Sequence, residues 1–356
     1  MRPAILAALL PLLAAPALAQ EPLTAVADSL EGPVRAVRVL RPLDSGVQEL
    51  APAYAVWYDR AGRRTEMVHY EKGEPRERQV YTYDARGRHT GHEEYWSPSG
   101  PLPPEPRRHL YVLDEEGRRT EYRVLGRDGS LQDRFAFAYD RAGRLREELF
   151  FTHRGELSSR SVYDYDARGN RVLWESYDRN GVRAGRRETR YDAAGRKVEE
   201  VVYQGGAAPR WRIEYRYDGE GRLAERETHD LAPNPSGPAA SHDPEPGKVV
   251  YTYRDGGRTV ETATYAPDGT LTGRVVQRRD GRGSSERVEY RPDGTLVPVR
   301  HYDAARRRVV EVPGKLVGRT EYDARGNWTR QTSTLVPADG GAPIPLWVQV
   351  REITYW

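Results

Sequence analysis

The sequence predicts an all-β protein, an antiparallel β-meander repeat array whose sheet is open or coiled and follows a cleaved signal peptide. Three observations support this prediction: a short motif recurs every 26 residues, each unit holds two turns, and Tyr, Val, Thr and Trp fill the stretches between turns. Composition agrees. Apolar residues at 37% are too few for a large aliphatic core, whereas 23 Tyr and 7 Trp argue against disorder.

Residues 1–19 have the pattern of a secretory signal peptide. Arg2 precedes an apolar run that ends in the cleavage pattern Ala17-Leu18-Ala19. Two prolines interrupt the run, which favours a signal over a membrane-spanning helix. We therefore expect an exported protein, periplasmic or extracellular, with no membrane span after signal cleavage. The chain contains no Cys, so disulfides and thiolate zinc sites are excluded.

The remaining chain divides into three parts. Residues 20–50 are an N-terminal capping segment, in which Val34–Leu40 alternate as a strand does. Residues 51–332 hold the repeats. Residues 333–356 end in a second alternating segment, which reads as a capping strand at the other end of the array.

Each repeat is anchored by the motif YDxxGR, followed by a second turn about half a unit later. Asp accepts hydrogen bonds from the backbone two residues on, and Gly adopts the positive φ that such turns need. Two insertions rich in Pro, Gly and Ser, 97–106 and 231–247, lengthen single units and are expected to be surface loops. The most regular anchors, 26 residues apart, are Leu113, Tyr139, Tyr165, Tyr191 and Tyr217.

Centring the two turns on the motif predicts which strand residues face each other. Aromatic residues two positions before the anchor, such as Tyr163, should face β-branched residues seven positions after it, such as Val172, and form the core face. On the other face, Glu199 should oppose Arg212 and Glu121 should oppose Arg134. The sheet would thus have one aromatic face and one face of ion pairs.

The YDxxGR units resemble the YD repeats of the RHS family over residues 54–330. The resemblance implies a β-rich array; in long family members such repeats wind into a shell around cargo, often a C-terminal toxin domain. This chain is far shorter, and no segment after its repeats reads as a toxin domain. The half-unit markers YAPDGTL at Tyr265 and YRPDGTL at Tyr290 are also similar to MORN-like meander repeats. Neither resemblance implies an activity.

No catalytic, cofactor-binding or metal-binding residues are predicted. The sequence has no H-E-x-x-H, G-x-S-x-G or Walker motif. His89 and His92 are the closest histidines, and their spacing places them on opposite faces of a strand. Adjacent glutamates recur at repeat positions, as expected of a solvated column that faces arginine, whereas a catalytic carboxylate pair occurs once.

Exposed aromatic side chains are the feature that indicates binding. The candidate ligand-binding residues are Trp96, Trp174 and Trp211, and Trp96 stands out because it abuts the 97–106 insertion. Because 56 Lys+Arg nearly cancel 53 Asp+Glu, the net charge does not favour binding of nucleic acid.

Our leading hypothesis is a non-enzymatic exported repeat protein of the cell envelope that binds or scaffolds a polysaccharide or a protein through an extended β surface. The alternatives are an envelope hydrolase with carboxylates near the 231–247 insertion, and a truncated member of an RHS-type toxin-delivery system.

Overall fold

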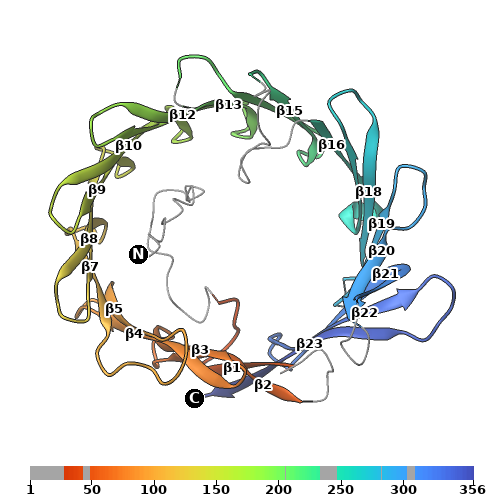
Figure 1. Cartoon of the computed structure of the whole chain (residues 1–356), viewed down its shortest axis with the longest axis horizontal. Coiled ribbons are helices and arrows are strands. Elements are labelled where there is room, and N and C mark those ends of the chain that lie inside the picture. The colour runs from red at the N-terminus through yellow and green to blue at the C-terminus, as the bar shows by residue number, and fades with distance from the viewer. Residues whose placement is uncertain (1–27, 43–48, 205, 233–246, 282, 303–308) are drawn as a thin grey trace, which may run out of the picture.

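The protein folds as a closed antiparallel β-barrel, which Figure 1 views end-on. The signal peptide expected at residues 1–19 lies outside the described residues, as does most of the 231–247 insertion. In the part of the chain that is described, no helix is long and apolar enough to cross a membrane. The computed structural model describes residues 28–42, 49–204, 206–232, 247–281, 283–302 and 309–356.

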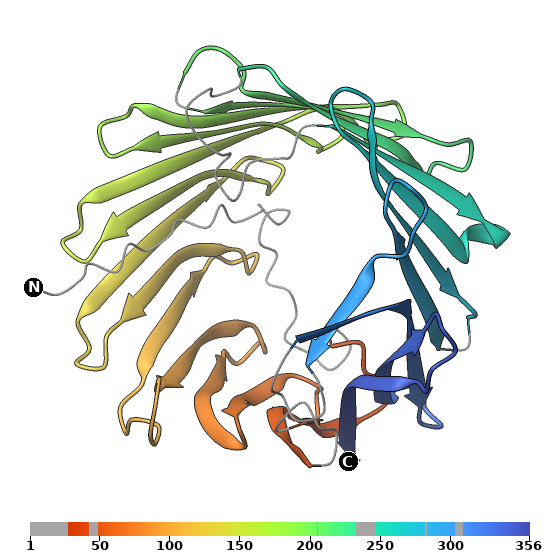
Figure 2. The same cartoon turned by 45° about the vertical axis from the view of Figure 1, so that its right-hand side comes forward.

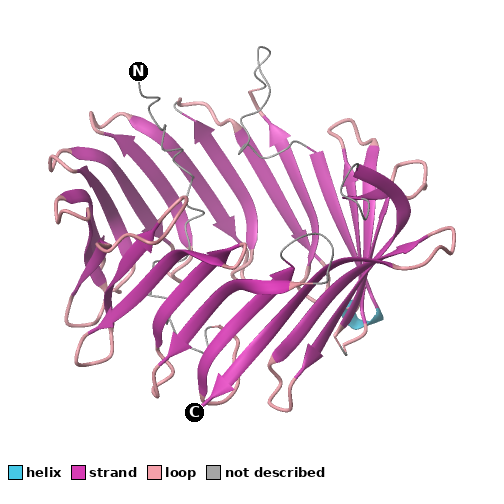
Figure 3. Ribbon diagram, turned by 60° about the horizontal axis from the view of Figure 1, so that its bottom comes forward, coloured by secondary structure: helices cyan, strands magenta, loops and turns pink. Residues whose placement is uncertain are grey.

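Hairpins connect the strands one after another, and the strands run between two rims of turns (Figure 3). The helical segment among the described residues is the short 3-10 turn η1 (Asp255–Gly257) between β16 and β17. The strands are β1 (Val34–Pro42), β2 (Leu50–Tyr58), β3 (Arg64–Glu71), β4 (Glu74–Tyr83), β5 (His89–Trp96), β6 (Arg107–Leu113), β7 (Arg119–Leu125), β8 (Leu131–Tyr139), β9 (Leu145–Thr152), β10 (Leu157–Tyr165), β11 (Arg171–Asp178), β12 (Arg183–Tyr191), β13 (Lys197–Gln204), β14 (Trp211–Tyr217), β15 (Leu223–Asp230), β16 (Gly247–Arg254), β17 (Thr259–Tyr265), β18 (Leu271–Arg279), β19 (Ser284–Tyr290), β20 (Pro298–Tyr302), β21 (Val309–Tyr322), β22 (Trp328–Pro337) and β23 (Ile344–Tyr355).

The first and last strands close the barrel. β1 pairs with β2 on one side and with β23 on the other, and both views place these strands together (Figures 1 and 2). β19 pairs with β21, whereas β20 pairs with the first part of β21 alone, so 22 of the 23 described strands form the ring. The predicted antiparallel β structure is confirmed. The predicted open or coiled sheet is wrong, because the two strands expected to cap its ends pair with each other.

An apolar cluster lies at this closure. The β1 side chains of Val34, Val37 and Val39 are at most 3% exposed, and they pack with Val56 and Tyr58 of β2. Full burial of a valine side chain stabilises the fold by about 1.5–3 kcal/mol. Partly buried side chains from β22 and β23 complete the cluster, namely Trp328, Ile353 and Tyr355.

The turns shift the predicted pairing by two residues. The hairpin between β10 and β11 contains a β-bulge, since Tyr165 faces Arg171 while the residue before it faces Leu173. Tyr163 therefore faces Trp174 and not Val172. The predicted register is wrong for two reasons. The turn is centred one pairing step later than assumed, so that Tyr165 faces Arg171 and not Asn170, and the bulge then inserts one further residue.

The predicted charges meet in part, because long side chains reach diagonal neighbours across strands. Arg212 Nε lies 2.7 Å from Glu199 Oε1, although the two residues do not directly face each other. The other predicted pair does not form, since Glu121 contacts Arg123 of its own strand while Arg123 faces Arg134. Partly exposed pairs of this kind contribute about 0.2–1 kcal/mol each.

The aromatic face lines the inside of the barrel. In a closed barrel, inward side chains converge and shield one another, whereas outward side chains spread apart. On the outer face of β6, Leu110 and Val112 are 39% and 44% exposed. All buried side chains of β4–β15 lie on the aromatic face, and these are Tyr81, Val124, Leu145, Tyr163, Thr189, Glu200, Trp211, Ile213 and Thr228.

This inner face is the lining of a wide barrel and not a packed core. A ring of 22 strands is wider than its own side chains can fill. Phe135, Phe150 and Trp174 accordingly remain partly exposed on it. The column of rings that we expected to form a core face is thus available, in part, to whatever enters the barrel.

Candidate functional site

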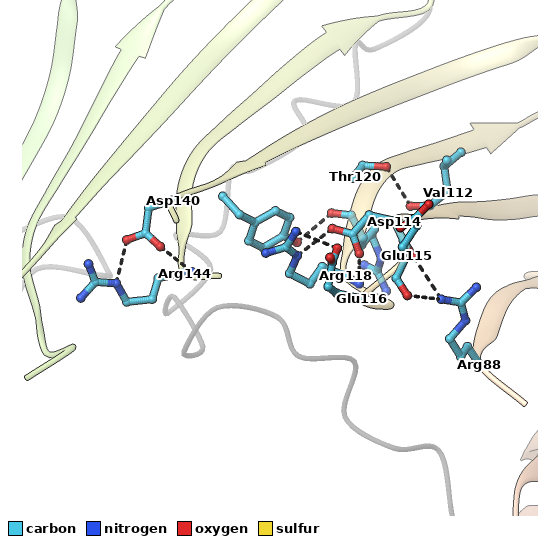
Figure 4. Close-up of polar contacts among 11 residues, drawn as sticks. Arg88, Val112, Asp114, Glu115, Glu116, Arg118, Thr120, Asp140 and Arg144 are labelled. Atoms are coloured by element: carbon cyan, nitrogen blue, oxygen red, sulfur yellow. Dashed lines mark hydrogen bonds and ion pairs between the residues drawn. The ribbon is translucent and has the colours of Figure 1, made fainter. Parts of the chain in front are cut away.

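The YDxxGR motif is explained by one rim of the barrel, here called the YD rim, which consists of turns such as Asp114–Arg118. Arg118 donates from its backbone N–H and from Nε to the Asp114 carboxylate, at 2.7 and 2.6 Å (Figure 4). Its guanidinium lies 5.0 Å over the ring of Tyr139, the anchor of the next unit. Tyr139 in turn donates to the carbonyl of Arg119 at 2.7 Å.

The same contacts recur along the YD rim. Arg144 donates to Asp140 and lies 4.8 Å over the Tyr165 ring. Hydrogen bonds from the backbone and side chain of Arg144 hold the pKa of Asp140 below its usual value. Arg88 reaches the following turn and donates to the carbonyl of Asp114 at 3.1 Å. The motif therefore joins consecutive units, and its charged groups bind one another.

Three histidines, here called the histidine stack, gather on the inner wall. His92 of β5 faces His109 of β6, with ring centroids 4.2 Å apart and planes 8° from parallel. His89 lies 6.3 Å from His92 in a stacked arrangement. The prediction that His89 and His92 point to opposite faces is wrong, because a bulge between His89 and Gly91 adds a residue to β5.

The histidine stack is shielded from water. Burial lowers the pKa of His89 to about 4, and burial together with the neighbouring histidines lowers the pKa of His92 to about 3. Both rings are therefore neutral near pH 7. His109 has polar contacts at both ring nitrogens, with Nδ1 2.7 Å from Tyr122 Oη and Nε2 3.3 Å from Glu94 Oε2.

A ladder of rings continues from the histidine stack across β6–β9. The centroids of Tyr122 and Phe135 are 5.4 Å apart, and those of Phe135 and Phe150 are 4.8 Å apart, with planes within 23° of parallel. Each ring pair contributes about 0.5–1.5 kcal/mol beyond its burial. Because the rings cover one another's faces, this ladder stabilises the wall and leaves mainly ring edges for a ligand.

A shallow recess lies at the rim opposite the YD rim, beside the end of β5. Trp96, the last residue of β5, is 49% exposed there. Arg127 Nη2 donates to the Trp96 carbonyl at 2.7 Å, which connects β5 to the turn after β7. The recess is lined by Arg107, Gly126, Arg127, Asp128 and Gln132. Together with the indole of Trp96, these guanidinium, carboxylate and amide groups can both stack on a sugar ring and hydrogen-bond its hydroxyls.

The three candidate tryptophans have different surroundings, and the structure does not bring them together. Trp174, on the inner wall of β11, packs over Gly185, where an added Cβ would lie 3.3 Å from the indole. Trp211, at the start of β14, is 1% exposed, and the Arg210 guanidinium lies 4.5 Å from its ring centroid. Of the three, Trp96 alone is about half exposed and lies beside a recess.

The sequence analysis missed one group of metal-ligating side chains. Glu214, Glu227 and His229 have ligand atoms within 4.8 Å of one another, on the outer face of β14 and β15. Arg212 and Arg216 lie 3.0 and 3.4 Å from Glu214, so arginine already neutralises this carboxylate. The available signal was His229 itself, which stands where most other units have an aromatic residue.

No protein-family model matches the chain, and no curated protein matches it. Among solved structures, a crystal structure of TcdB2-TccC3-TEV is 12% identical with a TM-score of 0.40, over 83% of this chain and 16% of that chain. The Photorhabdus luminescens Tc holotoxin pore is 13% identical with a TM-score of 0.30, over 82% of this chain and 19% of that chain. A porin-like protein from Bacteroides uniformis is 10% identical with a TM-score of 0.26, over 91% and 98% of the two chains. The class defined by the fold is a closed antiparallel β-barrel of 22 strands.

Proposed function

We propose that the protein is a non-enzymatic, exported barrel of the cell envelope that binds polysaccharide, with Trp96 and the recess beside it as a contact site. The observation behind this proposal is the exposed indole next to Arg107, Arg127 and Gln132. Sugar rings have apolar C–H faces that stack on an indole, and their hydroxyls bond to guanidinium and amide groups.

The two most shielded carboxylates of the inner wall lie too far apart for glycosidase chemistry. Glu148 and Glu200 are its strongly shielded acids, and burial raises the pKa of Glu148. They stand on β9 and β13, four strand spacings or roughly 19 Å apart. The two carboxyl groups of a glycosidase lie about 5–9.5 Å apart, on either side of the scissile bond. These two glutamates therefore do not form such a pair.

The ion pairs of the outer wall support the proposal that water surrounds the barrel. Cross-strand and diagonal ion pairs, such as Arg78 with Glu66 and Arg274 with Glu261, recur around the ring. Export rests on the pattern of residues 1–19, and a relationship to the RHS family rests on the YD units themselves. An envelope hydrolase near the 231–247 insertion and a truncated toxin-delivery component are the rival hypotheses.

Replacing Trp96 by alanine should weaken the binding of envelope polysaccharide fragments about tenfold, because loss of the indole stack costs about 1.4 kcal/mol. Isothermal titration calorimetry with the mature protein measures this change. Trp347→Ala is the matched control, since Trp347 is 37% exposed but stands on β23, five strand spacings around the ring from β5. Unchanged affinity in Trp96→Ala, or an equal loss in both variants, would contradict the proposed site. Release of new reducing ends would support the hydrolase instead.

A further inference from the structure

The β5–β6 seam, the pairing of residues 91–94 with residues 107–110, is a short joint in the barrel wall. It contains four facing pairs, whereas its neighbours β4–β5 and β6–β7 contain seven and six. One of the four pairs is His92 with His109, whose rings are 4.2 Å apart. Burying a charge on the His92 ring without a partner is costly. A joint of four pairs has few other contacts to offset that cost.

A proton on His92 has one carboxylate nearby, and the other groups around it disfavour the charge. That carboxylate, Glu94, lies 3.3 Å from His109 Nε2. Burial and the neighbouring His109, His89 and Arg119 outweigh the attraction of Glu94 and lower the pKa of His92. The titratable and charged groups that face the stack come from β3 to β7, and they are Arg64, Tyr81, Tyr83, Glu94, Arg107, Tyr111, Arg119 and Tyr122.

We propose that the β5–β6 seam is an acid-sensitive joint: protonation of His92, whose ring faces that of His109 across the seam, separates the two strands and opens the barrel wall beside the Trp96 recess. In the open seam the His92 imidazole is solvated and no longer stacked on its neighbours, so its charge is screened. The proposal is independent of the proposed polysaccharide binding, because it concerns the pairing of the wall and not its ligand.

The direction of the pH effect follows from linkage. The pKa of His92 is about 3 and that of His89 about 4 in the closed wall, both below the ordinary value of 6.5, chiefly through burial. In the open seam these histidines therefore bind protons at pH values at which they stay neutral in the closed seam. Closed-state stability is complete above pH 6.5 and falls as the pH drops below it. At pH 4.5 one such histidine favours opening by up to about a hundredfold relative to pH 7.5.

Hydrogen-exchange mass spectrometry of the mature protein at pH 7.5 and 4.5 tests the proposal, with protection factors corrected for the intrinsic rate at each pH. We expect protection of residues 91–94 and 107–110 to fall about ten- to a hundredfold at pH 4.5. The β13–β14 seam, also of four facing pairs, should keep its protection and is the internal reference. In His92→Phe, which extends the ring ladder, the loss at the β5–β6 seam should largely disappear. His153→Phe, at an exposed turn, should behave as the wild type.

Equal loss of protection at both four-pair seams, no loss at β5–β6, or an unchanged loss in His92→Phe would overturn the proposal. If His92→Phe does not fold, a disulfide across the seam keeps the test decisive. Glu93 and Arg108 face each other there, and the chain has no other cysteine to interfere with Glu93→Cys plus Arg108→Cys. The oxidised double variant should retain protection of the seam at pH 4.5, and the reduced one should lose it. Equal behaviour of the two forms would also contradict an opening at this joint.

Discussion

Replacing Gly91 by alanine should lower the free energy of unfolding by about 3–5 kcal/mol, which combines backbone strain with overpacking. Gly91 has φ 153°, a conformation that L side chains rarely adopt. A Cβ added there would lie 2.1 Å from the carbonyl oxygen of His109 on the paired strand. Because that oxygen belongs to the backbone of β6, the strands must move apart at a seam of only four facing pairs. Urea-induced unfolding followed by far-UV circular dichroism measures the loss.

Gly273→Ala is the matched control for this prediction. Gly273 also lies in a strand, β18, and its added Cβ would be 3.7 Å from the carbonyl oxygen of Tyr290, an ordinary contact. We expect that variant to retain wild-type stability within about 0.5 kcal/mol. Similar stabilities for Gly91→Ala and Gly273→Ala would show that β5 and β6 do not approach each other as closely as described.

Removing residues 344–356 should have the largest effect, because it deletes β23, the strand that closes the ring. β1 and β22 would both become free edges, and the apolar cluster of Val34, Val37 and Val39 would lose its β23 partners. We expect the free energy of unfolding to fall by more than about 5 kcal/mol, which is comparable to the whole stability of many domains. Soluble yield, size-exclusion chromatography and thermal unfolding report this loss as aggregation or absence of a cooperative transition.

Two further variants give a scale for the loss of stability in the truncated chain. Deletion of Trp356 alone shortens the chain but keeps β23, so a cooperative transition should remain. Leu335→Ala, at a side chain with 0% exposure in β22, should cost about 2–5 kcal/mol and so gives the scale of a single buried residue. A truncated chain that unfolds with wild-type cooperativity would mean that the barrel does not depend on β23.

Much of the fold could be predicted from the sequence because the 26-residue period and its turn residues are local signals. The pairing is displaced by two residues because neither the exact centre of a turn nor a bulge leaves a compositional mark. Tyr163 with Trp174 is as acceptable a pair as Tyr163 with Val172. Closure could not be predicted either. β1 and β23 lie at opposite ends of the sequence, and two alternating terminal segments read equally well as separate caps or as partners.

The site was harder to predict because it depends on neighbouring strands. The histidine stack requires both the bulge before Gly91 and the arrival of His109 from β6, and the sequence spacing of His89 and His92 indicated neither. The sequence identifies the arginine of the YDxxGR motif as part of a repeat, but its position over the tyrosine of the next unit is a contact between units. The exposure of Trp96 could be predicted because the insertion beside it is visible in the sequence, whereas its role in binding stays a prediction.

The central claim is that the barrel is closed by β1 and β23, and a cysteine pair across that junction tests it most directly. Arg38 and Glu352 face each other there, their charged atoms are 3.7 Å apart, and both side chains are 55% exposed. Facing strand residues have the Cα separation of about 4.5–5.5 Å that a disulfide needs, and the natural chain has no cysteine. Arg38→Cys plus Glu352→Cys should therefore oxidise to an intramolecular disulfide in nearly every monomer, identified by peptide mapping. Arg38→Cys plus Glu199→Cys, whose second cysteine would stand on the distant strand β13, should not form one. Free thiols or disulfide-linked dimers in the first variant would contradict a closed barrel.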